Sequence, residues 1–398
     1  MRGCPQGSIC GPFVWNLMMD ELLCLLVSLG CKVIAYADDL LICVEGNNRS
    51  ELERLGTEWM SHVVQWGERV GVSISESKTV CMLLKGKLKR GPCVNVNGKN
   101  LKFVASVKYL GVTVSEGMNF KEHLVSVRKK IMRVIGGFRR VLRKEWGLKK
   151  RTIVVLYKSL FVACGMYGAS VWYDCMCFQY ARDLINRAQR IVCCACLNVC
   201  RTVSTDAMQV LMGCLPWDLE CLRRATMFKL RRGMSVNDVG VVSDCDMKDM
   251  TMSECKRVIE ERVYEIWQQR WNESVNGRVT YEFIKNVRFS ESAMFNPSRP
   301  LNYLLTGHGR MNAYLYKYGM SDSESCDCGA ACEDWKHVLI ECKLYESFRD
   351  MSGFGVTVCE NGVVSVSGVL ESVERYLCVS EFAARVFDSR NARVCVND

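Results

Sequence analysis

Two adjacent aspartates, Asp38 and Asp39, stand between two apolar runs and are the residues of this chain best suited to bind a catalytic metal ion. The runs are residues 33–37 and 40–44, and neither contains a Gly, Asn or Pro that would end a buried strand. The pattern predicts a tight β-hairpin with both carboxylates at its tip. Paired carboxylates beside buried strands are costly to desolvate unless a cation lies between them, and Mg²⁺ (or Mn²⁺) prefers such oxygen ligands. The tip is therefore a predicted metal site, and a surface turn with two solvated aspartates is the alternative.

A second set of metal-ligand residue types lies near the C-terminus, where one of only four histidines follows two cysteines. The set consists of Cys326, Cys328, His337 and Cys342. Its residue types and spacing are typical of a tetrahedral Zn²⁺ site, in which Asp334 caps the helix that carries the histidine. Cys332 is an alternative ligand. Four coincidental residues in a chain with 25 cysteines are the alternative to a metal site.

The positive charge of the chain is concentrated in one segment. Residues 121–151 contain twelve lysines and arginines and two glutamates, so this segment alone equals the chain's net charge of +10. Apolar residues at spacings of three and four predict a helix here. Its predicted nucleic-acid-binding residues are Arg128, Lys129, Arg133, Arg139, Arg140, Arg143 and Lys144. Such a patch favours a polyanionic partner, with nucleic acid first and an anionic membrane second, and a solvated basic face is the alternative.

The elements that must position the aspartates can also be predicted. A glycine-rich loop at residues 3–8 precedes a helix with an apolar stripe of Val14, Met18, Leu22, Leu25 and Leu29, and a second amphipathic helix spans residues 50–71. Asn97-Gly98 predicts a hairpin turn. A hydrophobic content of 49% over 398 residues excludes wholesale disorder and allows two or three domains.

Four short motifs, in this order, resemble the palm of reverse transcriptases. They are Pro5-Gln6-Gly7, Tyr36-Ala37-Asp38-Asp39, Lys78-Thr79 and Tyr109-Leu110-Gly111. The last resembles a primer-gripping hairpin of non-LTR retrotransposon and group II intron polymerases. The C-terminal Cys/His set is similar to a motif of arthropod non-LTR elements, including the type-1 elements of ribosomal DNA.

This resemblance implies roles for the motif residues. Asp38 and Asp39 would hold paired metal ions for nucleotidyl transfer, and Lys78 would help to protonate pyrophosphate, although an isolated lysine is more often a solvated surface residue. Pro5, Gln6 and Gly7 would contact template and nucleotide, as would Tyr36, while Tyr109, Leu110 and Gly111 would hold the primer. The implied partners are element RNA as template, chromosomal DNA as target and primer, and deoxynucleoside triphosphates.

The predicted fold class is α+β. We expect the C-terminal part of a palm at residues 1–115, a helical thumb and connection at 116–243, and a nucleic-acid-binding region at 250–398 with a zinc knuckle at 326–342. The resemblance also implies an upstream part of the same polyprotein with a further metal-binding aspartate and the fingers, so the fragment alone is expected to be inactive or nearly so. The alternative function is a nucleic-acid-binding or endonuclease-associated module in which the palm remnant is scaffold.

The start of the chain and its cysteines indicate an intracellular protein. Residues 1–5 do not resemble a signal peptide, and the odd number of scattered cysteines indicates a reducing compartment. The resemblance implies the cytoplasm during synthesis and the nucleus during integration. Residues 153–172 are strongly apolar, but Lys158 and two glycines favour a buried core helix over a membrane span, and no membrane partner is expected.

Overall fold

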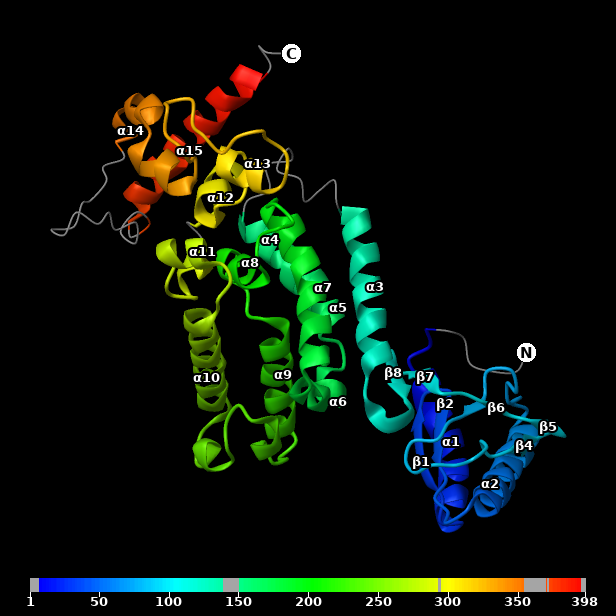
Figure 1. Ribbon diagram of the computed structural model, residues 1–398. Helices are drawn as coiled ribbons and strands as arrows, with labels where there is room; N and C mark the ends of the chain where they lie inside the picture. Colours follow the sequence, from blue (N-terminus) through cyan, green and yellow to red (C-terminus); the bar gives the residue numbers. More distant parts are fainter. Residues whose placement is uncertain (1–6, 139–149, 293–294, 354–369, 371, 395–398) are drawn as a thin grey trace. The chain divides into compact units, whose positions relative to one another are not determined.

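The computed structural model describes residues 7–138, 150–292, 295–353, 370 and 372–394 (Figure 1). The chain forms two compact units, Met1–Glu122 and His123–Asp398. The boundary between them lies close to the predicted end of the palm at residue 115. Residues 244–249 lie inside the second unit, and the three-part division of the chain stays a prediction.

The first unit is built around two helices and a hairpin. Helix α1 (Gly11–Ser28) leads into β1 (Lys32–Tyr36) and β2 (Asp39–Cys43), and α2 (Arg49–Val70) follows. Helix α2 begins at Asn48, whose side chain accepts the backbone N–H of Glu51, and it ends at Gly71, which has a φ of +76°. The core of this unit consists of Met19, Leu22, Leu26, Cys31, Trp59, Val63 and Trp66.

The predicted apolar stripe of α1 is wrong in part. Met19, Leu22 and Leu26 are buried, whereas Val14 is 53% exposed and Leu25 and Leu29 are partly exposed. The helix is apolar on nearly every side, so spacing alone does not identify the face that packs. By length and composition α1 could also cross a membrane, as could the bent pair of helices at Arg151–Gly165 and Ala169–Cys177, but core helices share these properties.

The remaining strands of the first unit form three separate pairs. They are β3 (Val80–Cys81) with β6 (Lys102–Phe103), β4 (Asn95–Val96) with β5 (Lys99–Asn100), and β7 (Ser106–Tyr109) with β8 (Val112–Ser115). The Asn97-Gly98 turn is confirmed, and both of its residues have positive φ, as a type I′ turn requires.

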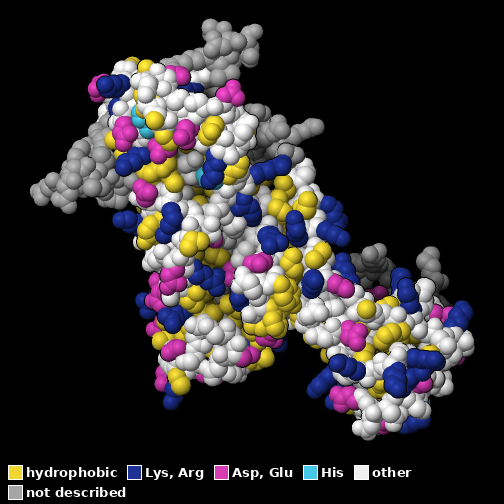
Figure 2. Space-filling view, in the orientation of Figure 1, with side chains coloured by type: hydrophobic (Ala, Val, Ile, Leu, Met, Phe, Trp, Pro, Cys, Tyr) yellow, Lys and Arg dark blue, Asp and Glu magenta, His cyan; other side chains and the backbone are white. Residues whose placement is uncertain are grey.

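The basic helix α3 (Lys121–Phe138) begins at the boundary of the two units. Leu124, Val127, Ile131 and Ile135 are buried, at the spacings of three and four from which a helix was predicted. The helix continues through Gly136 and Gly137 to its end. Figure 2 shows lysine and arginine side chains along α3. Those of Arg128, Lys129 and Arg133 are exposed, whereas Arg139, Arg140, Arg143 and Lys144 lie outside the described residues.

A buried histidine anchors the start of α3. The ring of His123 lies 5.7 Å from that of Trp172, measured between centroids. Burial lowers the pKa of His123 to about 4, so its imidazole is neutral at pH 7. The basic helix is therefore attached to the second unit by its apolar face and leaves its cations exposed.

The rest of the second unit is helical (Figure 1). Its helices are α4 (Lys150–Leu156), a π-helix (Tyr157–Val162), α5 (Ala163–Gly165), α6 (Ala169–Trp172), α7 (Gln179–Leu197), α8 (Thr205–Met212), α9 (Trp217–Arg231), α10 (Met252–Glu273), α11 (Arg278–Phe283), α12 (Arg299–Thr306), α13 (Asn312–Lys317), α14 (Glu346–Met351) and α15 (Val373–Val394). Tyr157, Phe161 and Trp172 are buried, which confirms the core interpretation of residues 153–172. The cap of α8 is Ser204, whose hydroxyl accepts the N–H of Ala207. All described cysteines are free thiols.

Candidate active site and metal centre

The paired aspartates lie where β1 turns into β2. Tyr36 pairs with Asp39 in the antiparallel register, which leaves Ala37 and Asp38 as the two turn residues. Ala37 has a φ of +52°, a conformation that hairpin turns compatible with strand twist adopt. Asp38 and Asp39 are both exposed. The predicted hairpin with two carboxylates at its tip is confirmed.

Trp15 of α1 holds this turn in place. Its indole Nε1 donates a hydrogen bond to the carbonyl oxygen of Ala37 over 2.8 Å. The bond joins a packed helix to the residue directly before Asp38, so the turn has a fixed support. The sequence prediction missed Trp15, whose only signal is its position on the same side of α1 as the buried Met19 and Leu22.

The second predicted hairpin approaches the first. Leu110 and Gly111 form the turn between β7 and β8, and both have positive φ. The hydroxyl oxygen of Tyr109 is buried and has no hydrogen-bond partner among the described residues. Burial, together with the negative charge of Asp39, raises the pKa of Tyr109. The charge of Asp39 therefore acts on the buried Tyr109 hydroxyl.

Of the other predicted palm residues, Tyr36 lies opposite Asp39 in the hairpin, whereas no hydrogen bond within the described chain joins Gly7 or Lys78 to the aspartates. Tyr36 is 63% exposed on β1, and Gly7 is exposed with a φ of +89°. Lys78 is exposed in a turn, where its N–H donates to the carbonyl of Ser75 over 3.1 Å. Residues 72–75, which precede this turn, form neither a helix nor a strand. Pro5 and Gln6 lie outside the described residues.

The two carboxylates at the hairpin suit a divalent ion whose other ligands come from water or from a substrate. In the described part of the chain, no third carboxylate, thiol or imidazole groups with Asp38 and Asp39. Two carboxylates fit Mg²⁺, because this ion commonly keeps waters and substrate phosphate oxygens as its other ligands.

The four predicted zinc ligands converge. The ligand atoms of Cys326, Cys328, His337 and Cys342 all lie within 4.8 Å of one another. The sulfurs of Cys326 and Cys342 are 3.6 Å apart, and the sulfur of Cys328 lies 3.2 Å from Nε2 of His337. Zn–S bonds of about 2.3 Å in a tetrahedron place sulfurs roughly 3.8 Å apart, so the set fits zinc. Cys332 is exposed and outside the group, so it is not the alternative ligand.

Neighbouring groups orient these ligands. The carboxylate of Asp334 accepts the backbone N–H of His337 over 2.8 Å, so the predicted cap is confirmed, although the turn after it is π-helical. Nδ1 of His337 lies 3.5 Å from a carboxylate oxygen of Glu341, which leaves Nε2 for the metal. A backbone hydrogen bond from Ala330 lowers the pKa of Cys328 to about 7, which favours the thiolate that zinc requires.

A buried ion pair joins the C-terminal helix to this centre. The guanidinium of Arg390, on α15, donates to both carboxylate oxygens of Glu333 over 2.5 and 2.7 Å. Glu333 is 2% exposed and also lies 3.6 Å from the sulfur of Cys326. Sequence reasoning missed both residues, because a single Glu and a single Arg far apart in the chain carry no recognisable spacing.

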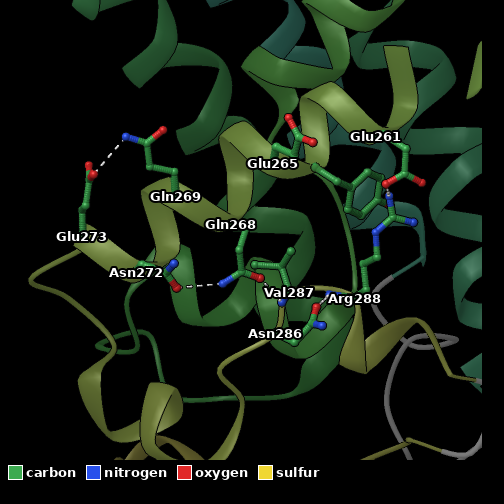
Figure 3. A pocket seen from close by; sticks show the side chains of 10 residues that line it. Glu261, Glu265, Gln268, Gln269, Asn272, Glu273, Asn286, Val287 and Arg288 are labelled. Atoms are coloured by element: carbon green, nitrogen blue, oxygen red, sulfur yellow. Dashed lines mark hydrogen bonds and ion pairs between the residues drawn. The ribbon is translucent and has the colours of Figure 1, made fainter. Parts of the chain in front are cut away.

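The second unit also has a shallow polar groove of about 470 Å³ along α10 (Figure 3). Two of its charged side chains pair with each other, since Arg288 binds Glu261 over 2.9 Å. Gln269 likewise donates to Glu273 over 3.0 Å. None of the predicted site residues lines this groove.

Comparison with known proteins places these features in a family. Residues 1–114 match the family model described as reverse transcriptase (RNA-dependent DNA polymerase). The chain is 47% identical to a Nasonia vitripennis retrovirus-related Pol polyprotein from type-1 retrotransposable element R1 2, over 98% of this chain and 97% of the relative. It is also 47% identical to the Bradysia coprophila Pol polyprotein from type-1 retrotransposable element R1, over 98% of this chain but 39% of that protein.

A more distant relative extends the same relationship. A probable RNA-directed DNA polymerase from transposon BS of Drosophila melanogaster is 24% identical over 48% of this chain and 22% of its own length. No solved structure matches the chain. With the paired aspartates on a supported hairpin and near-complete coverage by close relatives, the chain belongs to the Pol polyproteins of type-1 retrotransposable elements, and its first unit carries their reverse transcriptase domain.

Proposed function

We propose that this chain provides the metal-binding hairpin, the primer-contacting hairpin and the C-terminal nucleic-acid-binding part of an RNA-directed DNA polymerase that copies element RNA from a nicked chromosomal primer. The observation that carries the proposal is the position of Asp38 and Asp39 on a turn held by Trp15. Two exposed carboxylates on a rigid turn can be held at the fixed geometry that nucleotidyl transfer needs.

The protein's own residues have distinct tasks in this proposal. Asp38 and Asp39 hold the divalent ions, which when bound activate the primer 3′-hydroxyl and stabilise the leaving pyrophosphate. Lys78 delivers a proton to the pyrophosphate. Tyr109, with Leu110 and Gly111, holds the primer end beside Asp39.

The loop ending at Gly7, together with Tyr36, contacts template and nucleotide. The chain spans 39% of the Bradysia coprophila Pol polyprotein, and further groups of the catalytic centre are expected from the rest of such a polyprotein.

The second unit handles nucleic acid in this proposal. Helix α3 contacts primer and template phosphates through its exposed cations, because phosphate contacts position a duplex without selecting its sequence. Cys326, Cys328, His337 and Cys342 hold a structural Zn²⁺ near the chromosomal target. The protein is made in the cytoplasm and acts in the nucleus.

The test of the catalytic assignment is primer extension on an RNA template by the full-length polyprotein. Asp38→Asn should abolish extension, since it removes a charged metal ligand. Asp20→Asn, which removes an exposed carboxylate from α1, is the matched control and should leave extension unchanged. Extension by Asp38→Asn within a few-fold of the wild type would refute the assignment.

The alternative function is a nucleic-acid-binding module with the palm remnant as scaffold. The converged zinc ligands are the observation that favours it. This alternative predicts that Asp38→Asn leaves the full-length protein's extension intact while Cys342→Ser impairs nucleic-acid binding.

A further inference from the structure

Three aromatic rings form a ladder in the second unit. The ring centroid of Tyr314 lies 5.2 Å from that of His308 and 4.8 Å from that of Tyr318. The hydroxyl of Thr202 lies 2.7 Å from the hydroxyl of Tyr314 and 2.8 Å from Nδ1 of His308. One threonine therefore fixes two of the rings, and the third ring packs on the second.

The ladder is attached directly to the zinc ligands' loop. The backbone N–H of Asn312, at the start of α13, donates to the carboxylate of Glu333 over 3.0 Å, and its side-chain amide donates to the carbonyl of Ser325 over 2.7 Å. The N–H of Ala313 donates to the carbonyl of Glu333 over 3.2 Å. Helix α13 carries Tyr314 and ends directly before Tyr318. It is thus hydrogen-bonded to residues on both sides of Cys326.

The outer end of the ladder is open to solvent and has basic neighbours. Tyr318 is 44% exposed. Lys317 adjoins it, Arg201 precedes Thr202, and Arg310 follows His308 by two residues. Lys317 and Arg201 are both exposed. Burial and the positive charge of Lys317 lower the pKa of His308, so this ring is neutral at pH 7.

We propose that this ladder is a binding surface for single-stranded RNA, an inference that rests on the proposed function and names one of its partners. An unpaired base stacks on the exposed face of Tyr318, while Lys317 and Arg201 contact the flanking phosphates. Duplexes are excluded because their bases present no free face. The phenolic hydroxyl of Tyr318 donates to or accepts from a 2′-hydroxyl, a group that DNA lacks.

The same helix provides a matched control. Tyr316 is 51% exposed, slightly more than Tyr318. Two residues correspond to about 200° around a helix, so Tyr316 lies on the opposite side of α13 from the ladder. Replacing either tyrosine by alanine removes an equally exposed ring, but only one of them belongs to the ladder.

The experiment is fluorescence anisotropy of a labelled short single-stranded RNA with the zinc-loaded 398-residue chain. Tyr318→Ala should weaken binding by about tenfold, within the range that one stacked base supplies. Tyr316→Ala should bind within twofold of the wild type, and Tyr318→Trp should retain full affinity. Duplex RNA does not use the ladder and can bind only through other basic surfaces such as α3, so its affinity should be the same for all four proteins.

A second variant tests whether the ladder prefers RNA to DNA, and it keeps the aromatic ring at position 318. Tyr318→Phe keeps the stacking face and should bind RNA and DNA single strands alike, whereas the wild type prefers RNA. Equal losses from Tyr316→Ala and Tyr318→Ala, or a wild type that prefers single-stranded DNA, would overturn the proposal. Primer extension by Asp38→Asn tests the catalytic assignment and this titration tests the ladder, so failure of one is separable from failure of the other.

Discussion

At the scale of single residues, the catalytic turn depends on a side chain that does no chemistry. Trp15 donates to the carbonyl of Ala37, one residue before Asp38. Asp38 and Asp39 are exposed to solvent, and the hydrogen bond from Trp15 links their turn to a packed helix. Its loss changes the position of the ligands without changing their charge.

Trp15→Phe should therefore reduce primer extension by the full-length polyprotein by about tenfold, because small displacements of catalytic groups cost that much or more. Phenylalanine keeps the apolar contact and loses the donor. The control is Trp66→Phe, because Trp66 is buried and its Nε1 has no hydrogen-bond partner among the described residues. Equal activities of the two variants would show that the hydrogen bond is dispensable.

Sequence reasoning found the residues whose types suggest metal binding and that lie close together in the chain. Asp38 and Asp39 are adjacent, and the four Cys/His residues lie within one short segment, so their types alone were informative. Trp15 and Arg390 act through contacts that folding creates, and neither has a partner at a helical or strand spacing. No periodicity in one sequence can reveal such pairs.

At the scale of elements, α15 completes the metal centre from far along the chain. Its Arg390 neutralises Glu333, which is buried beside the sulfur of Cys326. Without the guanidinium, a carboxylate would be left unpaired at 2% exposure. The helix is therefore part of the zinc region rather than an appendage to it.

Arg390→Met should lower the stability of the zinc region by about 3–5 kcal/mol, the cost of leaving a buried charge unpaired. The measurement is the chelator concentration at which zinc is released. Arg385→Met breaks an exposed pair with Glu381 on the same helix and should cost about 1 kcal/mol or less. Adding Glu333→Gln should restore part of the loss, and unchanged zinc release in Arg390→Met would contradict this role for α15.

Helix α3 makes a different prediction, because its cations are exposed. Reversing Arg128, Lys129 and Arg133 to Glu should weaken binding to unrelated sequences equally and lower the salt slope by about one unit per lost phosphate contact. The control reverses three exposed cations elsewhere in the second unit, Lys248, Lys256 and Arg257. If the α3 variant has the same salt slope as the wild type, the exposed cations of α3 are solvated and do not contact phosphates.

The elements that were predicted well are those with signals at their ends. Helix α2 has Asn48 and Gly71 at its limits, and the Asn97-Gly98 turn fixes its own hairpin. Helix α1 has neither a polar face nor a side-chain cap. Packing against α2, and not the sequence pattern of α1, therefore determines which face is buried. Tertiary packing decides what a uniformly apolar pattern leaves open.

At the scale of the whole molecule, the two compact units separate the predicted chemistry from the predicted metal structure. Cys342→Ser should release zinc and increase hydrogen exchange around residues 326–345, because the metal supplies much of the folding energy of so small a region. Exchange in Met1–Glu122 should not change.

The control for this variant is Cys332→Ser, which replaces an exposed thiol outside the ligand set and should keep its zinc. Elemental analysis gives the metal content directly. Less than one zinc per wild-type chain in reduced, folded protein would leave the four residues without a metal role.

The bond between Trp15 and Ala37 also has an optical consequence. An indole next to a carboxylate pair is an antenna: light absorbed by Trp15 is transferred to a luminescent lanthanide such as Tb³⁺ that replaces Mg²⁺ at Asp38 and Asp39. Trp15→Phe should therefore reduce this luminescence, because it removes the indole that is bonded to the turn. Terbium luminescence would thus report ion binding at the catalytic turn of the 398-residue chain, without template, primer or turnover.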